Sequence, residues 1–217
     1  KKEFANTREM RKATAAAMSS SSAPILFNKI NEPFGCMSNF SPHSIVVDGL
    51  SYRTTEHFFQ AMKFAPTPAV AEEIRNTKSP MCAAMAGRSR SRPLRKDWEA
   101  LKDVVMEVAL LCKFSQHHDL QGLLISTGSR KIVEHTARDK YWGDGGDKGT
   151  GTIGKNRLGF LLEKVRSYFL SPEGRSAAQV SDLTEELMKR IRCVAATPRP
   201  ADGGESLVLS KKRMREE

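Results

Sequence analysis

The chain has 217 residues, and its 35 lysines and arginines exceed its 25 acidic residues, which gives a formal net charge of +10. A chain of this length can bury the core of one ordinary domain or of two small ones, and we expect one domain with terminal tails. The charge favours nucleotides, nucleic acids or other phosphorylated ligands, and no apolar run approaches the about 20 residues needed to span a bilayer.

The N-terminal part predicts a flexible arm followed by a few short strands. Residues 1–24 contain a serine and alanine tract that is too poor in large apolar side chains to offset its ordering entropy. Segments rich in strand formers follow at Ile25 to Phe27, Ser44 to Val47 and Leu50 to Tyr52. The dipeptide Asp48-Gly49 separates the last two and is a strong signal for a hairpin turn.

From residue 54 onward, helical spacing dominates. Apolar side chains recur every three or four positions in segments that predict helices at Thr54 to Phe64, Ala69 to Asn76, Pro80 to Ala86, Asp97 to Phe114, His118 to Ser126 and Asn156 to Leu170. Pro80 suits a first helical position, and Asp97 suits an N-cap. The sequence therefore predicts a mainly α fold with a small β-hairpin or sheet, in a single compact domain over residues 25–170.

Residues 171–217 read as a C-terminal extension of that domain. Helical spacing over residues 180–194 predicts a docked helix, and the prolines and glycines after it indicate a disordered basic tail. The cluster KKRMR, Lys211 to Arg215, suits a nuclear import signal or a nucleic-acid contact, although basic clusters at chain ends also occur without function.

The cysteines argue for a reducing compartment. Cys36, Cys82, Cys112 and Cys193 show neither CxxC spacing nor a partnering histidine cluster, so we expect no zinc site and no disulfide framework. The start of the chain lacks the apolar segment of a signal peptide. We expect a soluble intracellular protein, cytosolic or nuclear, although the first residue, a lysine, leaves a longer precursor open.

The segment TTEHFFQAMKF, Thr54 to Phe64, combines apolar and ionisable residues in an unusual way. At about 100° per residue, Glu56, Gln60 and Lys63 share one stripe of a helix, and a threonine can cap its first turn. A solvated face with a Glu to Lys pair is the simpler interpretation. A polar active-site stripe is the alternative.

Two loops add candidate binding residues. GRSRSRPLR, Gly87 to Arg95, holds four arginines whose planar guanidinium groups suit phosphate, with Arg88 and Arg92 as candidate contacts, or it is a solvated basic loop. The turn that contains Gly35, Ser38 and Asn39 can direct small polar groups at a ligand.

The third polar stretch, Val133 to Gly159, joins acids, a Tyr-Trp pair and a glycine-rich loop to a helix start near Asn156. Glycines and a helix N-terminus suit phosphate binding, but the stretch has neither P-loop nor Rossmann spacing. A surface loop without function is the alternative.

Together, the motifs resemble the NADAR superfamily. FGCMSNFSP, DGLSYRTTEHFFQAMKF, SPMCAAMAGRSRSRPLRKDWEALKDVVM, LLISTG, IVEHTARDKYWGDGG and GKNRLGFLL occur in this order over about Ile25 to Leu170. The resemblance implies a mainly helical N-glycosidase. Members act on phosphoribosylamino-pyrimidine intermediates of riboflavin synthesis or remove ADP-ribose from guanine bases in nucleic acid.

The same resemblance implies site residues. It assigns catalytic roles to Glu56, Lys63, Glu134 and Asp139, and substrate contacts to Trp98, Tyr141, Trp142, Gly143 and Asp144. YRTTEH replaces the family's usual WPTSEH, which affects only local packing. The segment DKGTGTI lengthens the glycine loop before GKNRLG, so that substrate reach can differ.

The chemistry of breaking a ribose C1 to nitrogen bond suits these residue types. A carboxylate near C1, with Glu56 as first choice, stabilises the positive charge that develops on the sugar, and Glu134 or Asp139 can supply acid-base catalysis. Lys63 can bind as an ammonium or attack the opened sugar as an amine, and Trp98 and Trp142 can stack a base.

Three functions follow from these considerations. The first is an N-glycosidase that removes ADP-ribose from guanine in a nucleotide, DNA or RNA. The second is the same chemistry on riboflavin precursors, and the third is an ADP-ribose binding module without turnover. We expect no metal, no cofactor and no membrane partner.

Overall fold

A computed structural model describes residues 22–146 and 154–196 of the chain. In chain order, its elements are β1 (Ile25–Phe27), η1 (Gly35–Met37), β2 (Ile45–Val47), β3 (Leu50–Tyr52), α2 (Thr55–Met62), α3 (Pro68–Arg75), α4 (Pro80–Arg88), α5 (Trp98–Gln116), α6 (His118–Ser126), β4 (Ile132–Glu134), α7 (Arg157–Leu170), η2 (Glu173–Arg175) and α8 (Ala177–Ala196). The predicted mainly helical fold is confirmed.

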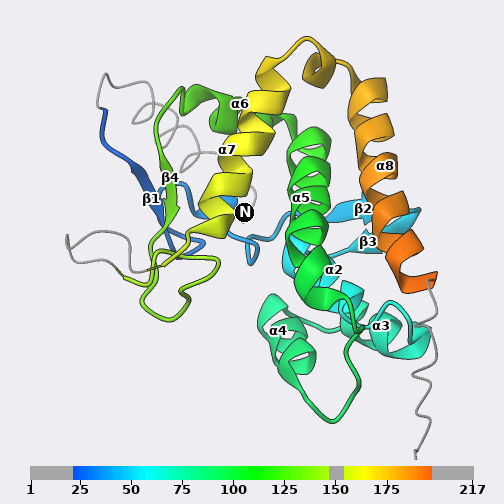
Figure 1. The fold of residues 1–217 in the computed structure, drawn as a ribbon. Helices are drawn as coiled ribbons and strands as arrows, with labels where there is room; N and C mark the ends of the chain where they lie inside the picture. Colours follow the sequence, from blue (N-terminus) through cyan, green and yellow to red (C-terminus); the bar gives the residue numbers. More distant parts are fainter. Residues whose placement is uncertain (1–21, 147–153, 197–217) are drawn as a thin grey trace, which may run out of the picture.

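The long helix α5 stands at the centre of the molecule, between α7 and α8 (Figure 1). One side of α5 contacts α2, which in turn packs on α3 and α4. Twelve of its side chains are buried, because apolar residues surround it on several sides. Among the described residues, no helix is both long and apolar enough to cross a membrane.

The predicted hairpin is present as the antiparallel pair β2 and β3. Asp48 and Gly49 have φ angles of 50° and 74°, the left-handed conformations that a tight two-residue turn between twisted strands requires. The strand β4 is not among the predicted elements. It pairs in parallel with β1, so that the described part of the chain has two separate two-stranded sheets.

Helix boundaries follow local chemistry. The Thr54 side chain accepts a hydrogen bond from the backbone N–H of His57 and caps α2, and Pro80 opens α4. Asp97 makes no side-chain cap for α5, because its carboxylate is engaged by Arg95. Helix α8 runs across the segment where spacing predicts a helix from 180 to 194, and the basic tail lies outside the described residues.

Candidate functional site

Helix α2, the turn after η1, β4 and the loop after β4 enclose a cavity of about 220 Å³. Its walls also include side chains of α4 and α5. The lining residues are Asn39, Phe40, Glu56, Phe59, Gln60, Lys63, Arg88, Met106, Glu134, Asp139 and Trp142.

The polar stripe of α2 faces this cavity rather than solvent. Glu56 and Gln60 are buried, and the Gln60 amide donates a hydrogen bond of 2.7 Å to Glu56 Oε1. Burial raises the pKa of Glu56, and the Gln60 hydrogen bond, Lys63 and Arg88 oppose that rise less strongly. The protonated form of Glu56 is therefore favoured relative to an exposed glutamate.

Lys63 lies at the C-terminal end of α2. Its Nζ is 3.5 Å from the Gly87 carbonyl oxygen and lies 5.5 Å and 5.6 Å from the ring centres of Phe59 and Trp98. Burial lowers the pKa of Lys63 to about 8, since the attraction of Glu56 only partly compensates for it and Arg90 and Arg88 lower it further. At neutral pH, a fraction of this lysine is an uncharged amine.

The close packing of α4 on α2 depends on Gly87. A Cβ atom at this position would lie 1.8 Å from the Gln60 Oε1 atom, so that any larger residue would push Gln60 or α4 away. The Gly87 carbonyl oxygen also lies 3.5 Å from Lys63 Nζ. A single glycine thus lets α4 approach Gln60 and Lys63 of the stripe closely.

Glu134 ends β4 on the opposite wall. Burial raises the pKa of Glu134 to about 7, and the neighbouring Asp139, Glu56 and Asp144 carboxylates raise it too. Asp139 Oδ1 accepts hydrogen bonds from the backbone N–H groups of Tyr141 and Trp142, at 2.8 Å and 2.7 Å. The cavity therefore combines three carboxyl groups, an amine of lowered pKa and the Arg88 guanidinium.

Four of the predicted substrate contacts line this cavity, namely Asn39, Gln60, Arg88 and Trp142. Asn39 also supports α2, because its backbone carbonyl accepts a hydrogen bond from the Glu56 N–H and its side chain accepts one from Thr55 Oγ1. The Trp142 ring packs edge-on against Phe59, with ring centres 5.3 Å apart.

The other eight predicted contacts do not line it: Gly35, Ser38, Arg92, Trp98, Tyr141, Gly143, Asp144 and Asn156. Trp98 lies next to it, behind Phe59 and beside Lys63. Tyr141 donates a hydrogen bond to Asp103, and Arg92 pairs with Glu73.

Several of these residues shape the loops that carry the site. Asp144 accepts hydrogen bonds from the His135 ring and from the backbone N–H groups of Thr136 and Gly146. Asn156, with φ of 47°, donates to the Ile132 carbonyl and accepts from the Glu134 N–H, which ties the start of α7 to β4.

Of the remaining three, Gly143 accepts a hydrogen bond of 3.0 Å from the Asn156 N–H. Gly35 and Ser38 support the turn after β1. Gly35 packs against the backbone of Lys29 and Ile30, and no Cβ would fit there. The Ser38 carbonyl accepts a hydrogen bond of 2.9 Å from Lys113, a fully buried lysine. Both residues therefore stabilise the backbone that presents Asn39.

Phe40, Phe59 and Met106 line the cavity although the sequence does not single them out. No signal in the sequence distinguishes an apolar side chain that lines a site from one that fills the core. Met106 accepts a hydrogen bond from the Asn39 amide through its sulfur, at 3.2 Å, which is visible only in three dimensions.

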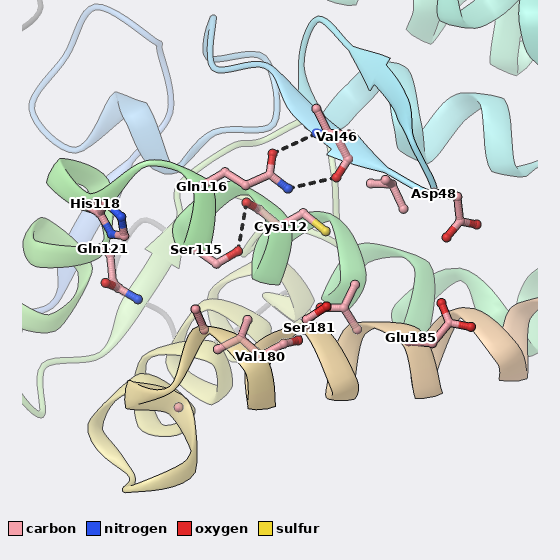
Figure 2. A pocket seen from close by; sticks show the side chains of 14 residues that line it. Val46, Asp48, Cys112, Ser115, Gln116, His118, Gln121, Val180, Ser181 and Glu185 are labelled. Carbon is pink, nitrogen blue, oxygen red and sulfur yellow. Dashed lines mark hydrogen bonds between the residues drawn. The ribbon is translucent and has the colours of Figure 1, made fainter.

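A second cavity, of about 380 Å³, lies between α5, α6, β2 and α8 (Figure 2). None of the predicted site residues lines it. Gln116 uses its amide there to bond both the N–H and the carbonyl of Val46, each at 2.8 Å, and so ties α5 to the edge of β2. This cavity has no cluster of ionisable groups comparable to that of the first.

The chain is similar to several known proteins. The NADAR domain profile matches residues 26–170. N-glycosidase YbiA of Escherichia coli is 50% identical over 142 residues, which cover 65% of this chain and 86% of that protein. N-glycosidase Npun_R5314 of Nostoc punctiforme is 40% identical over 144 residues, 65% of this chain and 90% of that protein.

A plant protein and a solved structure extend the comparison. The chloroplastic riboflavin biosynthesis protein PYRR of Zea mays is 40% identical over 167 residues, 70% of this chain but 26% of that protein. The NMR structure of E. coli YbiA superposes with a TM-score of 0.65 at 46% identity, over 73% of this chain and 91% of the other. The chain is a hydrolase of N-glycosidic bonds, and it belongs to the NADAR domain family.

Proposed function

We propose that the enzyme removes ADP-ribose from guanine bases of nucleotides or nucleic acid by hydrolysing the ribose C1 to nitrogen bond. The observation that carries this proposal is the shared cavity of Glu56, Glu134, Asp139 and Lys63, with Arg88 on its wall. A module that only binds ADP-ribose does not need a buried acid and amine with shifted pKa values.

The carboxyl groups suit the two requirements of the reaction. In its ionised form, which the Gln60 hydrogen bond and the positive charges of Lys63 and Arg88 favour, Glu56 is the proposed stabiliser of the positive charge on the sugar, and it orients the water that adds to C1. Glu134, whose pKa is raised to about 7, is the proposed acid that protonates the departing base nitrogen, because an acid works best with a pKa near the working pH. The negative charge of Asp139 helps to keep Glu134 protonated, because it raises the pKa of Glu134.

Lys63 has two proposed roles. With its pKa lowered to about 8, about a tenth of the lysine is uncharged at pH 7, against a negligible fraction for an ordinary lysine. The amine can attack C1 of the ring-opened sugar, which the base still holds as an imine, so that the bond from C1 to the base nitrogen breaks and the base leaves as its amine. Water then hydrolyses the lysine Schiff base and frees Lys63. The ammonium form instead binds a sugar hydroxyl or a phosphate.

The size and charge of the site indicate how the rest of the substrate lies. At about 220 Å³, the cavity is smaller than the about 300–1,000 Å³ typical of pockets that enclose a whole ligand. It suits the reacting sugar, while the diphosphate extends past Arg88 toward the basic loop. The positive net charge of the chain supports a polyanionic substrate.

A phosphoribosylamino-pyrimidine of the riboflavin pathway is the second candidate substrate. The specific observation in its favour is the identity with the riboflavin biosynthesis protein of maize. The same carboxyl groups and lysine serve that reaction, and the single phosphate of the sugar would meet Arg88.

A product assay on both substrate classes tests these alternatives. Wild type is compared with Glu56→Gln, which keeps the shape of the side chain, and with Glu186→Gln, an exposed glutamate of α8, as a matched control. We expect faster cleavage of the ADP-ribosylated guanosine and loss of that cleavage only in Glu56→Gln. Cleavage of the pyrimidine substrate alone would refute the proposed substrate.

A further inference from the structure

Arg95 links the C-terminal helix to the segment that precedes α5. Its side chain is 1% exposed, and it forms a two-point ion pair with Asp97, with bonds of 2.7 Å and 2.9 Å from Nε and Nη2. Nη2 also donates a hydrogen bond of 2.8 Å to the backbone carbonyl of Ile191 in α8. Such charge-assisted, buried bonds hold two segments in one relative position.

The segment from Arg95 to Trp98 also contacts Lys63 in two ways. The Arg95 backbone N–H donates a hydrogen bond of 3.0 Å to the Lys63 carbonyl, at the point where α2 ends. The Trp98 N–H bonds the Arg95 carbonyl, and the Trp98 ring lies 5.6 Å from Lys63 Nζ. Both the main chain and the side-chain environment of Lys63 therefore depend on where this segment lies.

Helix α8 lies outside the part of the chain that matches the NADAR domain, which ends at residue 170. It is nonetheless firmly docked, because Val180, Leu187, Met188 and Ile191 are buried in the same core as α5. Arg192, one residue beyond Ile191, pairs with Asp48 in the hairpin turn. The end of α8 nearest to Arg95 is thus fixed from two sides.

We propose that α8 is part of the active-site scaffold, and that Arg95 is the positioning residue through which it sets the place of Lys63. The inference rests on the proposed role of Lys63 in the reaction. On this proposal, α8 affects catalysis although it lies beyond the family domain. Displacement of the Ile191 carbonyl would release the Arg95 side chain, and with it the segment that holds the end of α2.

A double-mutant cycle in the full-length chain tests the coupling. Arg95→Met removes the link, Ile191→Ala loosens the docking of α8 near the carbonyl, and the double variant combines them. Arg75→Met is the matched control, because Arg75 likewise pairs with a carboxylate, Glu72, and donates to a backbone carbonyl, that of Ser51.

We expect each single variant to lower kcat about tenfold or more with little change in KM, since small displacements of a reacting group have effects of that size. The double variant should be no worse than Arg95→Met alone, because both changes act through one link. Arg75→Met should leave kcat unchanged and combine additively with Ile191→Ala.

A second measurement does not depend on turnover. The rate of reductive methylation of Lys63, followed by mass spectrometry across pH, reports its pKa, which should rise from about 8 in Arg95→Met as the lysine gains solvent. A purely structural role would lower the melting temperature with kcat and the methylation profile unchanged, and that result would overturn the inference. If wild type cleaved neither proposed substrate but Arg95→Met still shifted the methylation profile of Lys63, only the proposed substrates would be refuted.

Discussion

Replacing Glu134 by glutamine should make the protein more stable while it impairs catalysis. Burial and three neighbouring carboxylates raise the pKa of Glu134 from 4.5 to about 7. When folding raises the pKa of a carboxyl, the free energy of unfolding falls as pH rises from the unfolded pKa to the folded pKa, because in that range the folded state binds more protons than the unfolded state. The penalty is absent at pH 4 and complete at pH 8.

The shift corresponds to about 3 kcal/mol at pH 8, and partial solvent exposure of the side chain reduces the expected value to about 2 kcal/mol. Glutamine keeps the shape of the side chain but carries no charge, so Glu134→Gln should gain this amount at pH 8 and nothing at pH 4. For a chain of this length, the gain equals roughly 5 °C in melting temperature.

Urea unfolding of wild type and Glu134→Gln at pH 4, 6 and 8 measures the effect directly, with Glu186→Gln as the exposed control. The difference between the variants should grow with pH, and activity should fall in Glu134→Gln only. Equal stability of wild type and Glu134→Gln at pH 8 would show that Glu134 is not held protonated by its surroundings, and the proposed acid role would fail with it.

Three further predictions concern the cavity and its surroundings. If Lys63 acts as an amine and Glu134 as an acid, kcat/KM should peak between about pH 7 and 8, and borohydride added during turnover should trap a sugar on Lys63. If instead kcat/KM only falls above pH 7, no adduct forms and Lys63→Arg stays active, then Lys63 has only an electrostatic role. Gly87→Ala should lower activity more than tenfold, because the new methyl group displaces Gln60, whereas Gly122→Ala, with open space around its Cβ position, should be neutral in the same assay. Cleavage of an ADP-ribosylated oligonucleotide should weaken more steeply with salt than cleavage of an ADP-ribosylated nucleoside, and deletion of residues 1–21 and 197–217 should flatten only the oligonucleotide slope. Equal slopes for both substrates, with and without these residues, would exclude a contact with the phosphate backbone of nucleic acid.

The polar stripe of α2 could be predicted from sequence because its cause is local. Glu56, Gln60 and Lys63 are spaced by one helical turn, and this spacing alone brings them to one face. The choice between a solvated face and a site could not be made from spacing. It depends on α4, β4 and the turn before β2, which bury the stripe through contacts distant in sequence.

Other features depend on such distant contacts entirely. The sequence assigns Val133 and Glu134 of β4 to a polar stretch rather than to a strand, and β4 exists because β1 supplies its hydrogen-bonding partner. Asp97 fits an N-cap by residue type, but the Arg95 guanidinium competes for its carboxylate. Lys113 of α5 is fully buried and donates hydrogen bonds to the Ser38 carbonyl and to the Ser41 hydroxyl, which its residue type and helical position do not indicate.

The parallel pairing of β1 with β4 also constrains how the enzyme can assemble. Ile25 pairs with Ile132 and Phe27 with Glu134, so Glu134 in the cavity wall is held in register by a strand from the N-terminal start of the family domain. Contacts so far apart in the chain form slowly, because the loop-closure entropy must be overcome first. We therefore expect catalytic competence to arise late in refolding, after the local helices have formed, and a nascent chain to stay inactive until β4 has left the ribosome and paired with β1.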